Sequence, residues 1–117
     1  MTYIDGMVIA VRDDDRALYI AHALNVAKIF RDHGALQVVD CWGDDVPDGK
    51  VTSFPMAVQK QPGETVVFSW VSWPSKAVRD AGWPQAMADP RMAGPDAAMP
   101  FDGKRMIFGG FQMIVDA

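Results

Sequence analysis

The chain has 117 residues, of which one is a cysteine and two are histidines. One cysteine excludes an internal disulfide and a zinc site made of several thiolates. The longest apolar run, Met7–Val11, is far shorter than the ~20 residues that a membrane-spanning helix needs. The first residues lack the basic and apolar regions of a signal peptide. Together these absences predict a soluble, cytoplasmic protein.

Glutamate and excess basic charge are also scarce. Of the 15 acidic residues only Glu64 is a glutamate, and the formal net charge is −4. Proteins that bind nucleic acid usually carry a basic face, so we expect neither a nucleic-acid partner nor, from the short apolar runs, a membrane partner. Because aspartate is a good cap and turn residue, most of the acids are predicted to mark the ends of helices and strands.

Apolar residues, in contrast, are abundant. Hydrophobic residues make up 50% of the chain and charged residues 22%, a balance typical of a folded protein rather than a disordered one. A chain of this length has the size of one domain, so residues 1–117 are predicted to form a single domain. Runs rich in branched and aromatic residues predict four strands. They are Tyr3–Arg12, Leu36–Trp42, Thr65–Trp73 and Met106–Val115.

The first predicted helix runs from Arg16 to His33, where apolar residues follow the 3.6-residue spacing. Asp13–Asp15 are expected to cap its start, and Gly34 stands where a C-terminal glycine belongs. The segment 50–63 is harder to interpret. Around Phe54 it is either a helical turn started by Ser53 or an irregular edge segment.

The second predicted helix begins after Ser75. Gly82-Trp83-Pro84 predicts a break or kink, because proline lacks the backbone N–H and disfavours a helical residue before it. A last helical turn is expected over Pro84–Ala88. The segment from Asp89 to Gly103 is predicted to be a loop. It contains Pro90, Pro95 and Pro100.

The order of these elements is β-α-β, connector, β-α-β. It predicts an α+β fold of the ferredoxin-like kind, with an antiparallel sheet and both helices on one face. The first, third and fourth predicted strands are apolar on both faces, whereas a sheet with one face in water alternates apolar and polar residues. Something must therefore cover the face that the helices leave open.

A second copy of the same sheet is the simplest cover for that face. We therefore expect a homodimeric α+β barrel whose assembly or folding depends on Phe108 and Phe111. The alternative is that the connector around Phe54 and the loop around Phe101 fold over the second face.

Six segments carry a resemblance to a known family. They are Tyr3–Gly6, His33–Leu36, Thr52–Pro55, Val66–Trp70, Ala88–Arg91 and, the longest, Met99–Phe111. These segments, which span nearly the whole chain, resemble the YbaA-like family of uncharacterised bacterial proteins. That family is similar to the dimeric α+β barrels, so the resemblance implies the same fold. It implies no activity and no catalytic residue, and the Gly82-Trp83-Pro84 interruption departs from the family pattern.

The two histidines lie on the first predicted helix, about 16 Å apart along its axis. They cannot hold one metal ion together, and no neighbouring cysteine or carboxylate completes a metal motif. We therefore expect no metal and no cofactor. His22 is predicted to lie at the edge of the core. His33, just before Gly34, is placed to stabilise the helix C-terminus when protonated. Both are also candidate ligand-binding residues.

Asp40 and Cys41 stand in the second predicted strand. Cys41 is expected to be a buried, inert thiol. A carboxylate in a mostly apolar strand needs a partner, and Arg12 or Arg105 would make Asp40 a structural ion pair. The functional interpretation makes Asp40 a polar anchor in a pocket with Trp70 or Trp73 as an apolar wall, so Asp40 and Trp70 join the candidate ligand-binding residues.

Two functions remain open at this point. The first is a non-catalytic module that binds a small apolar ligand or a protein partner. The second is a small enzyme of the cofactor-independent oxygenase kind acting on an apolar substrate, by analogy with the dimeric barrels. A formed cavity with His22, His33 or Asp40 pointing inward would keep the second hypothesis open.

Overall fold

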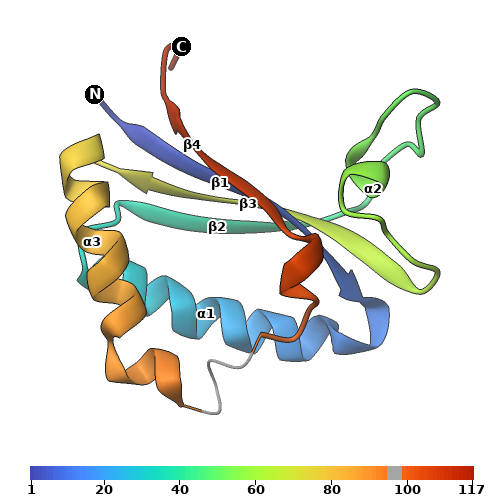
Figure 1. Ribbon diagram of the computed structural model, residues 1–117, viewed down its shortest axis with the longest axis horizontal. Coiled ribbons are helices and arrows are strands. Elements are labelled where there is room, and N and C mark those ends of the chain that lie inside the picture. Colours follow the sequence, from blue (N-terminus) through green and yellow to red (C-terminus); the bar gives the residue numbers. More distant parts are fainter. Residues whose placement is uncertain (95–98) are drawn as a thin grey trace.

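The structure, a computed structural model, describes residues 1–94 and 99–117 as one antiparallel sheet with helices on it (Figure 1). Its strands are β1 (Tyr3–Arg12), β2 (Gln37–Trp42), β3 (Glu64–Trp73) and β4 (Ile107–Gln112). Their spatial order is β2-β3-β1-β4, and each neighbouring pair is antiparallel. The predicted α+β class and antiparallel sheet are confirmed. β4 is shorter than predicted, since residues 113–117 leave the strand.

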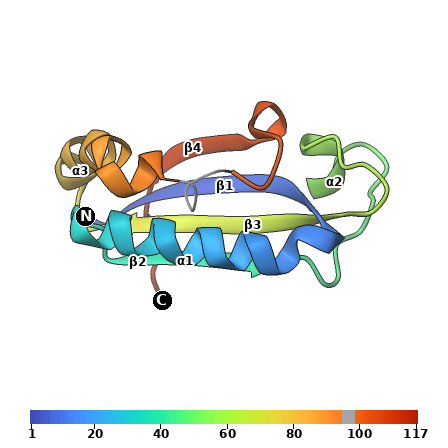
Figure 2. The ribbon, with the colours of Figure 1, turned by 90° about the horizontal axis from the view of Figure 1, so that it is seen from below.

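Two long helices, α1 (Arg16–Asp32) and α3 (Lys76–Ala88), lie on the same side of the sheet (Figure 2). Gly34 ends α1 with a positive φ of 109°, as a C-terminal glycine should. The expected aspartate cap at the start is wrong. Asp13–Asp15 form a 3-10 turn, and Asp15 stands at the N-cap position of α1 but its side chain makes no cap hydrogen bond. Within the described ranges, no helix is long and apolar enough to cross a membrane.

The predicted break in the second helix does not occur, because α3 continues through Pro84 to Ala88. Ser75 caps its start, as predicted, and accepts a hydrogen bond from the backbone of Val78. Gly82 is buried against β3, and a Cβ there would lie 2.6 Å from the Trp73 ring. Close packing on Trp73 therefore holds the helix in place, and this outweighs the hydrogen bond lost at exposed Pro84.

Residues 43–63 form the connector between β2 and β3, which includes the segment around Phe54. A short helix, α2 (Phe54–Ala57), begins at Ser53, whose hydroxyl accepts from the backbone of Met56. Val58 follows it and is fully buried against the sheet. The helical-turn alternative for this segment is the correct one.

Successive side chains along each strand point to opposite faces of the sheet. One face carries the two long helices and is called the helix side, and the other is called the open face. On the helix side, Ile9 and Val11 of β1 pack with Tyr19 of α1. On the open face, the connector covers only one end, where Val58 packs on Val8, Ala10 and Val66.

The rest of the open face is apolar and partly exposed. Phe68, Ile107 and Phe111 expose 44%, 43% and 59% of their surface there. Phe101, expected as a possible cover for this face, lies on the helix side beside Tyr19. The covering alternative thus holds for the connector but not for the Phe101 loop.

In the described part of the loop predicted over residues 89–103, Pro90–Ala93 forms a short 3-10 turn and another, Gly103–Arg105, begins at its end. Pro95 lies outside the described residues. The second turn is fixed by Arg105, whose guanidinium forms a two-pronged ion pair with Glu64 at 2.8 and 2.7 Å. Arg105 also donates to the backbone carbonyl of Gln59. This ion pair joins the start of β3, the connector and the entry to β4.

The Glu64–Arg105 pair should make the stability of the protein depend on acid pH. The hydrogen bond from Arg105 lowers the pKa of buried Glu64 from 4.5 to about 2. Because the folded-state pKa is the lower one, this stabilisation is complete above pH 4.5 and is lost as the pH falls toward 2. At pH 7, Glu64→Gln should lower the free energy of unfolding by about 3 kcal/mol, measured by urea unfolding.

Asp102→Asn is the matched control, because Asp102 is an exposed carboxylate that also accepts from Arg105. It should cost much less than Glu64→Gln. The difference in the free energy of unfolding between wild type and Glu64→Gln should decrease as the pH falls from 4.5 to 2. A difference that stays constant over that range would contradict the assigned role of the pair.

Candidate functional site

A cavity of about 420 Å³ lies between the helix side of the sheet and the segments that cover it. Its walls contain five of the chain's eight methionines: Met7, Met87, Met92, Met99 and Met106. Phe30 and Trp83 add aromatic surface. The walls are thus mainly apolar and adaptable in shape, since methionine is flexible and polarisable.

Four polar residues also line this cavity: Tyr19, His22, Asp40 and Ser69. Tyr19 and His22 come from α1. Asp40 on β2 lies directly across from Ser69 on β3, so both side chains point to the helix side of the sheet. The fold therefore gathers the polar groups of three elements into one apolar cavity.

Tyr19 and Asp40 form a hydrogen-bonded pair. The Tyr19 hydroxyl donates to Oδ1 of Asp40 at 2.5 Å. Burial, together with this bond to the carboxylate, raises the pKa of Tyr19 far above its ordinary value of 10. The tyrosine therefore stays protonated, and its only proton is directed at Asp40.

The Tyr19 ring is also part of a cluster of three rings, with His22 and Phe101. The ring centroids of Tyr19 and His22 are 6.3 Å apart, and the Phe101 ring lies 6.0 Å from Tyr19 and 6.1 Å from His22. These are tilted or edge-on contacts, the arrangements that aromatic pairs favour. They connect α1 to the segment that precedes β4.

The predicted ion pair of Asp40 is wrong, because Tyr19 is its partner and Arg105 binds Glu64. Asp40 is also an exposed residue. A second hollow of about 380 Å³, between α1 and β2, reaches the same pair from outside. Arg16 lines only this outer hollow, with its guanidinium 5.4 Å from the centre of the Trp42 ring.

His33 lies away from the cavity, at the C-terminal end of α1. Its Nε2 is 2.9 Å from Oδ2 of Asp89, which caps the turn after α3. Asp89 also accepts two hydrogen bonds from the Arg91 side chain. Arg91 first, and His33 second, hold the pKa of Asp89 well below its usual range. The structure thus uses His33 to join the ends of α1 and α3.

Cys41 and Trp70 lie on the open face of the sheet, away from the cavity. The expectation of a buried thiol is wrong, because Cys41 is exposed on edge strand β2. Trp73 is on the helix side but is fully buried and does not line the cavity. The tryptophan of the cavity is Trp83, which the sequence analysis treated only as part of a helix break.

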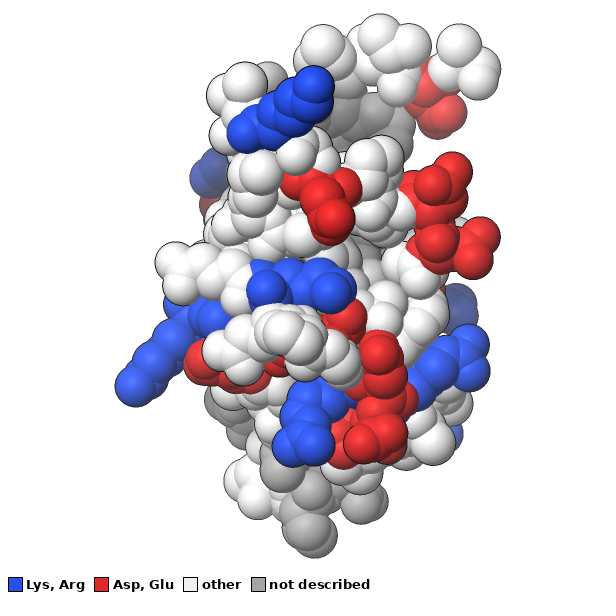
Figure 3. Space-filling view, turned by 90° about the vertical axis from the view of Figure 1, so that its right-hand side faces the viewer, with Lys and Arg blue, Asp and Glu red and all other residues white. Residues whose placement is uncertain are grey.

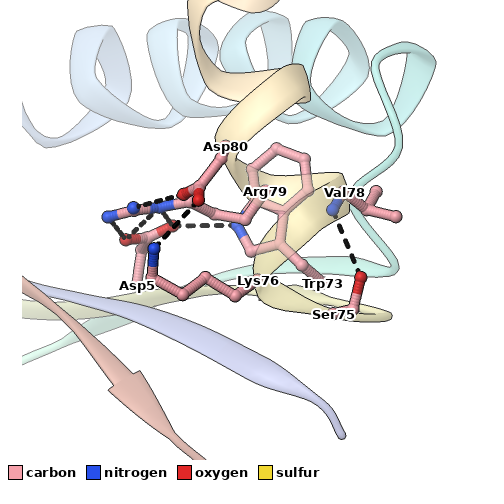
Figure 4. Close-up of polar contacts among 7 residues, drawn as sticks. All are labelled: Asp5, Trp73, Ser75, Lys76, Val78, Arg79 and Asp80. Carbon is pink, nitrogen blue, oxygen red and sulfur yellow. Dashed lines mark hydrogen bonds and ion pairs between the residues drawn. The ribbon is translucent and has the colours of Figure 1, made fainter.

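A second polar cluster is centred on Asp5, which lies among side chains of β3 and α3 (Figure 4). Asp5 is only 4% exposed, and it accepts from Nε1 of Trp73 at 2.9 Å and from Nη2 of Arg79 at 2.8 Å. The Arg79 guanidinium also lies over the rings of Tyr3 and Trp83, at 5.2 and 5.9 Å. The cluster joins β1, β3 and α3.

Asp5 is not among the residues predicted from the sequence, although the signal that indicates Asp40 applies to it as well. Both are carboxylates within apolar strands. Both face the helix side, but Asp5 is the one that is buried and paired with arginine.

Within residues 1–94 and 99–117, no three His, Cys, Asp or Glu side chains are grouped to hold a metal ion. On the end of the molecule seen in Figure 3, acidic and basic side chains lie interspersed.

Comparison with known proteins assigns the chain to a family. Residues 2–103 match the family described as "Protein of unknown function (DUF1428)". The chain belongs to this family. The uncharacterized protein YbaA of Escherichia coli K12 is 53% identical over 116 residues, which cover 99% of both chains, and YbaA of Shigella flexneri matches equally well. The resemblance to the YbaA-like family is confirmed.

A solved structure supports the fold. The structure of Rv0793 from Mycobacterium tuberculosis superimposes with a TM-score of 0.54 over all of this chain and 99% of that one. The two sequences are 13% identical. This likeness concerns the fold alone.

Asp5→Asn should destabilise the protein by about 3 kcal/mol, because it removes the buried carboxylate that pairs with the half-buried Arg79 guanidinium. Urea unfolding at a fixed protein concentration measures the loss. Asp80→Asn is the control, since exposed Asp80 accepts from the same arginine. Equal losses in the two variants would show that burial of Asp5 contributes nothing special.

Proposed function

We propose that this protein is a homodimeric α+β barrel that binds a small apolar ligand in the methionine-lined cavity. The observation that carries the proposal is the cavity itself, in which five methionines surround the single Tyr19–Asp40 pair. Ligand sites are typically apolar cavities of about 300–1,000 Å³ with a few polar groups that fix the orientation of the ligand. Methionine side chains adapt to ligands of different shape.

Catalysis on an apolar substrate, of the cofactor-independent oxygenase kind, is the alternative. It is supported by His22 and Asp40, which both line the cavity, whereas His33 does not. Binding is favoured because Asp40 already accepts the Tyr19 proton and His33 is engaged with Asp89. Mass spectrometry of a bound probe after incubation in air separates the two: an unchanged mass supports binding, and added oxygen supports catalysis.

A neutral fluorescent probe tests the cavity. N-phenyl-1-naphthylamine is apolar, carries one N–H donor and brightens in apolar surroundings. Ala23 lines the cavity from α1, so Ala23→Trp should fill it and weaken probe binding at least tenfold, or about 1.4 kcal/mol, in a fluorescence titration. Leu18→Trp, at an exposed position of the same helix, should leave the affinity unchanged. Equal binding by wild type and Ala23→Trp would contradict the proposed site.

The dimer is proposed to form through the open face. Support comes from its exposed apolar side chains on two strands, β3 and β4, and on the connector, because monomers rarely expose a large contiguous apolar patch. They include Phe54, Met56, Phe68, Ile107 and Phe111. The pairing of two such faces would bury them in a two-fold interface.

The two phenylalanines of β4 give a matched test of the dimer. Phe111 pairs with Ile4 on the open face, whereas Phe108 pairs with Met7 on the helix side, and both are exposed. Phe111→Asp should convert a dimer into a monomer in sedimentation velocity, because it buries a charge in the interface. The expectation that Phe108 also belongs to the dimer face is wrong, because Phe108 lies on the helix side, so Phe108→Asp should remain dimeric. A wild-type monomer, or dissociation by Phe108→Asp alone, would contradict an open-face dimer.

A further inference from the structure

The Tyr19–Asp40 pair of the cavity is arranged to accept hydrogen bonds, and Ser69 and His22 line the same cavity. The Tyr19 proton is used on Oδ1 of Asp40, so the pair offers a ligand the second carboxylate oxygen and the phenol oxygen. An ionised carboxylate is a pure acceptor with room for several donors. A ligand that binds at this pair must therefore bring a donor.

The charge of the cavity also favours a ligand that donates hydrogen bonds. Asp40 belongs to none of the ion pairs among residues 1–94 and 99–117. The described walls of the cavity include this carboxylate but no lysine or arginine. Arg16, the basic residue of the outer hollow, stacks instead near Trp42. A carboxylate in the wall of a cavity attracts a cation and repels an anion.

From this geometry we infer that the ligand is a hydrophobic amine, bound in its protonated form. This inference rests on the proposed binding function. The ammonium group donates to Asp40, within reach of the faces of Tyr19 and Phe101, and aromatic faces attract cations. The apolar part of the amine lies among the methionines. Apolar carboxylic acids, by the same argument, are rejected.

Three probes that share one ring system test the charge. They are 1-naphthylmethylamine, 1-naphthylmethanol and 1-naphthoate, titrated at pH 7 by isothermal calorimetry. The amine should bind at least tenfold more tightly than the alcohol, and the carboxylate should bind most weakly. Asp40→Asn keeps an acceptor for Tyr19 but removes the charge, so it should abolish the preference for the amine and leave alcohol binding within about threefold.

Asp45→Asn is the matched control, because it removes one negative charge from an exposed position outside the cavity. It should retain the preference for the amine. Equal affinities for the three probes, or an amine preference that survives Asp40→Asn, would overturn the inference while leaving the cavity as a binding site. Failure of these probes and of N-phenyl-1-naphthylamine alike would overturn the proposed function itself.

Discussion

A buried carboxylate on the first strand sets the geometry of the helix side of this protein. Asp5 cannot be charged inside the fold without partners, because an unpaired buried charge costs several kcal/mol. It obtains them from Trp73 on β3 and Arg79 on α3, so the sheet and the helix are joined at one point. Arg79 in turn lies over the Trp83 ring, which forms part of the cavity wall. The position of the wall thus depends on a charge outside the methionine cluster.

The apolar residues on the two faces of the sheet are covered in different ways. On the helix side, α1, α3 and the segment before β4 cover the apolar residues but leave a cavity. The Glu64–Arg105 pair holds the beginning of that last segment to β3 and so brings Phe101 and Met106 over the sheet. On the open face the connector covers one end, and residues 1–94 and 99–117 leave the remainder partly exposed.

Local sequence patterns predicted most of the helices and strands, because the periodicity of a strand or a helix depends on residues that are close together in the sequence. β1 has its predicted bounds, Tyr3–Arg12, and Ser75 caps α3 as predicted. The predictions were wrong where a residue distant in the sequence determines the local structure or the ion-pair partner. Packing of Gly82 on Trp73 keeps α3 continuous through Pro84, and Glu64 removes Arg105 from Asp40. A sequence with 14 aspartates offers each arginine many partners, and only the fold selects among them.

The Tyr19–Asp40 pair explains how the cavity can combine an apolar lining with an acid. Asp40 stands on edge strand β2, where the outer hollow keeps it in contact with solvent, so its charge is not fully desolvated. The Tyr19 hydroxyl orients the carboxylate from the inside without neutralising it. An arginine at this position would have compensated the charge and closed the site to cations. A tyrosine leaves the charge available, which is the property expected of a site that selects its ligand by charge.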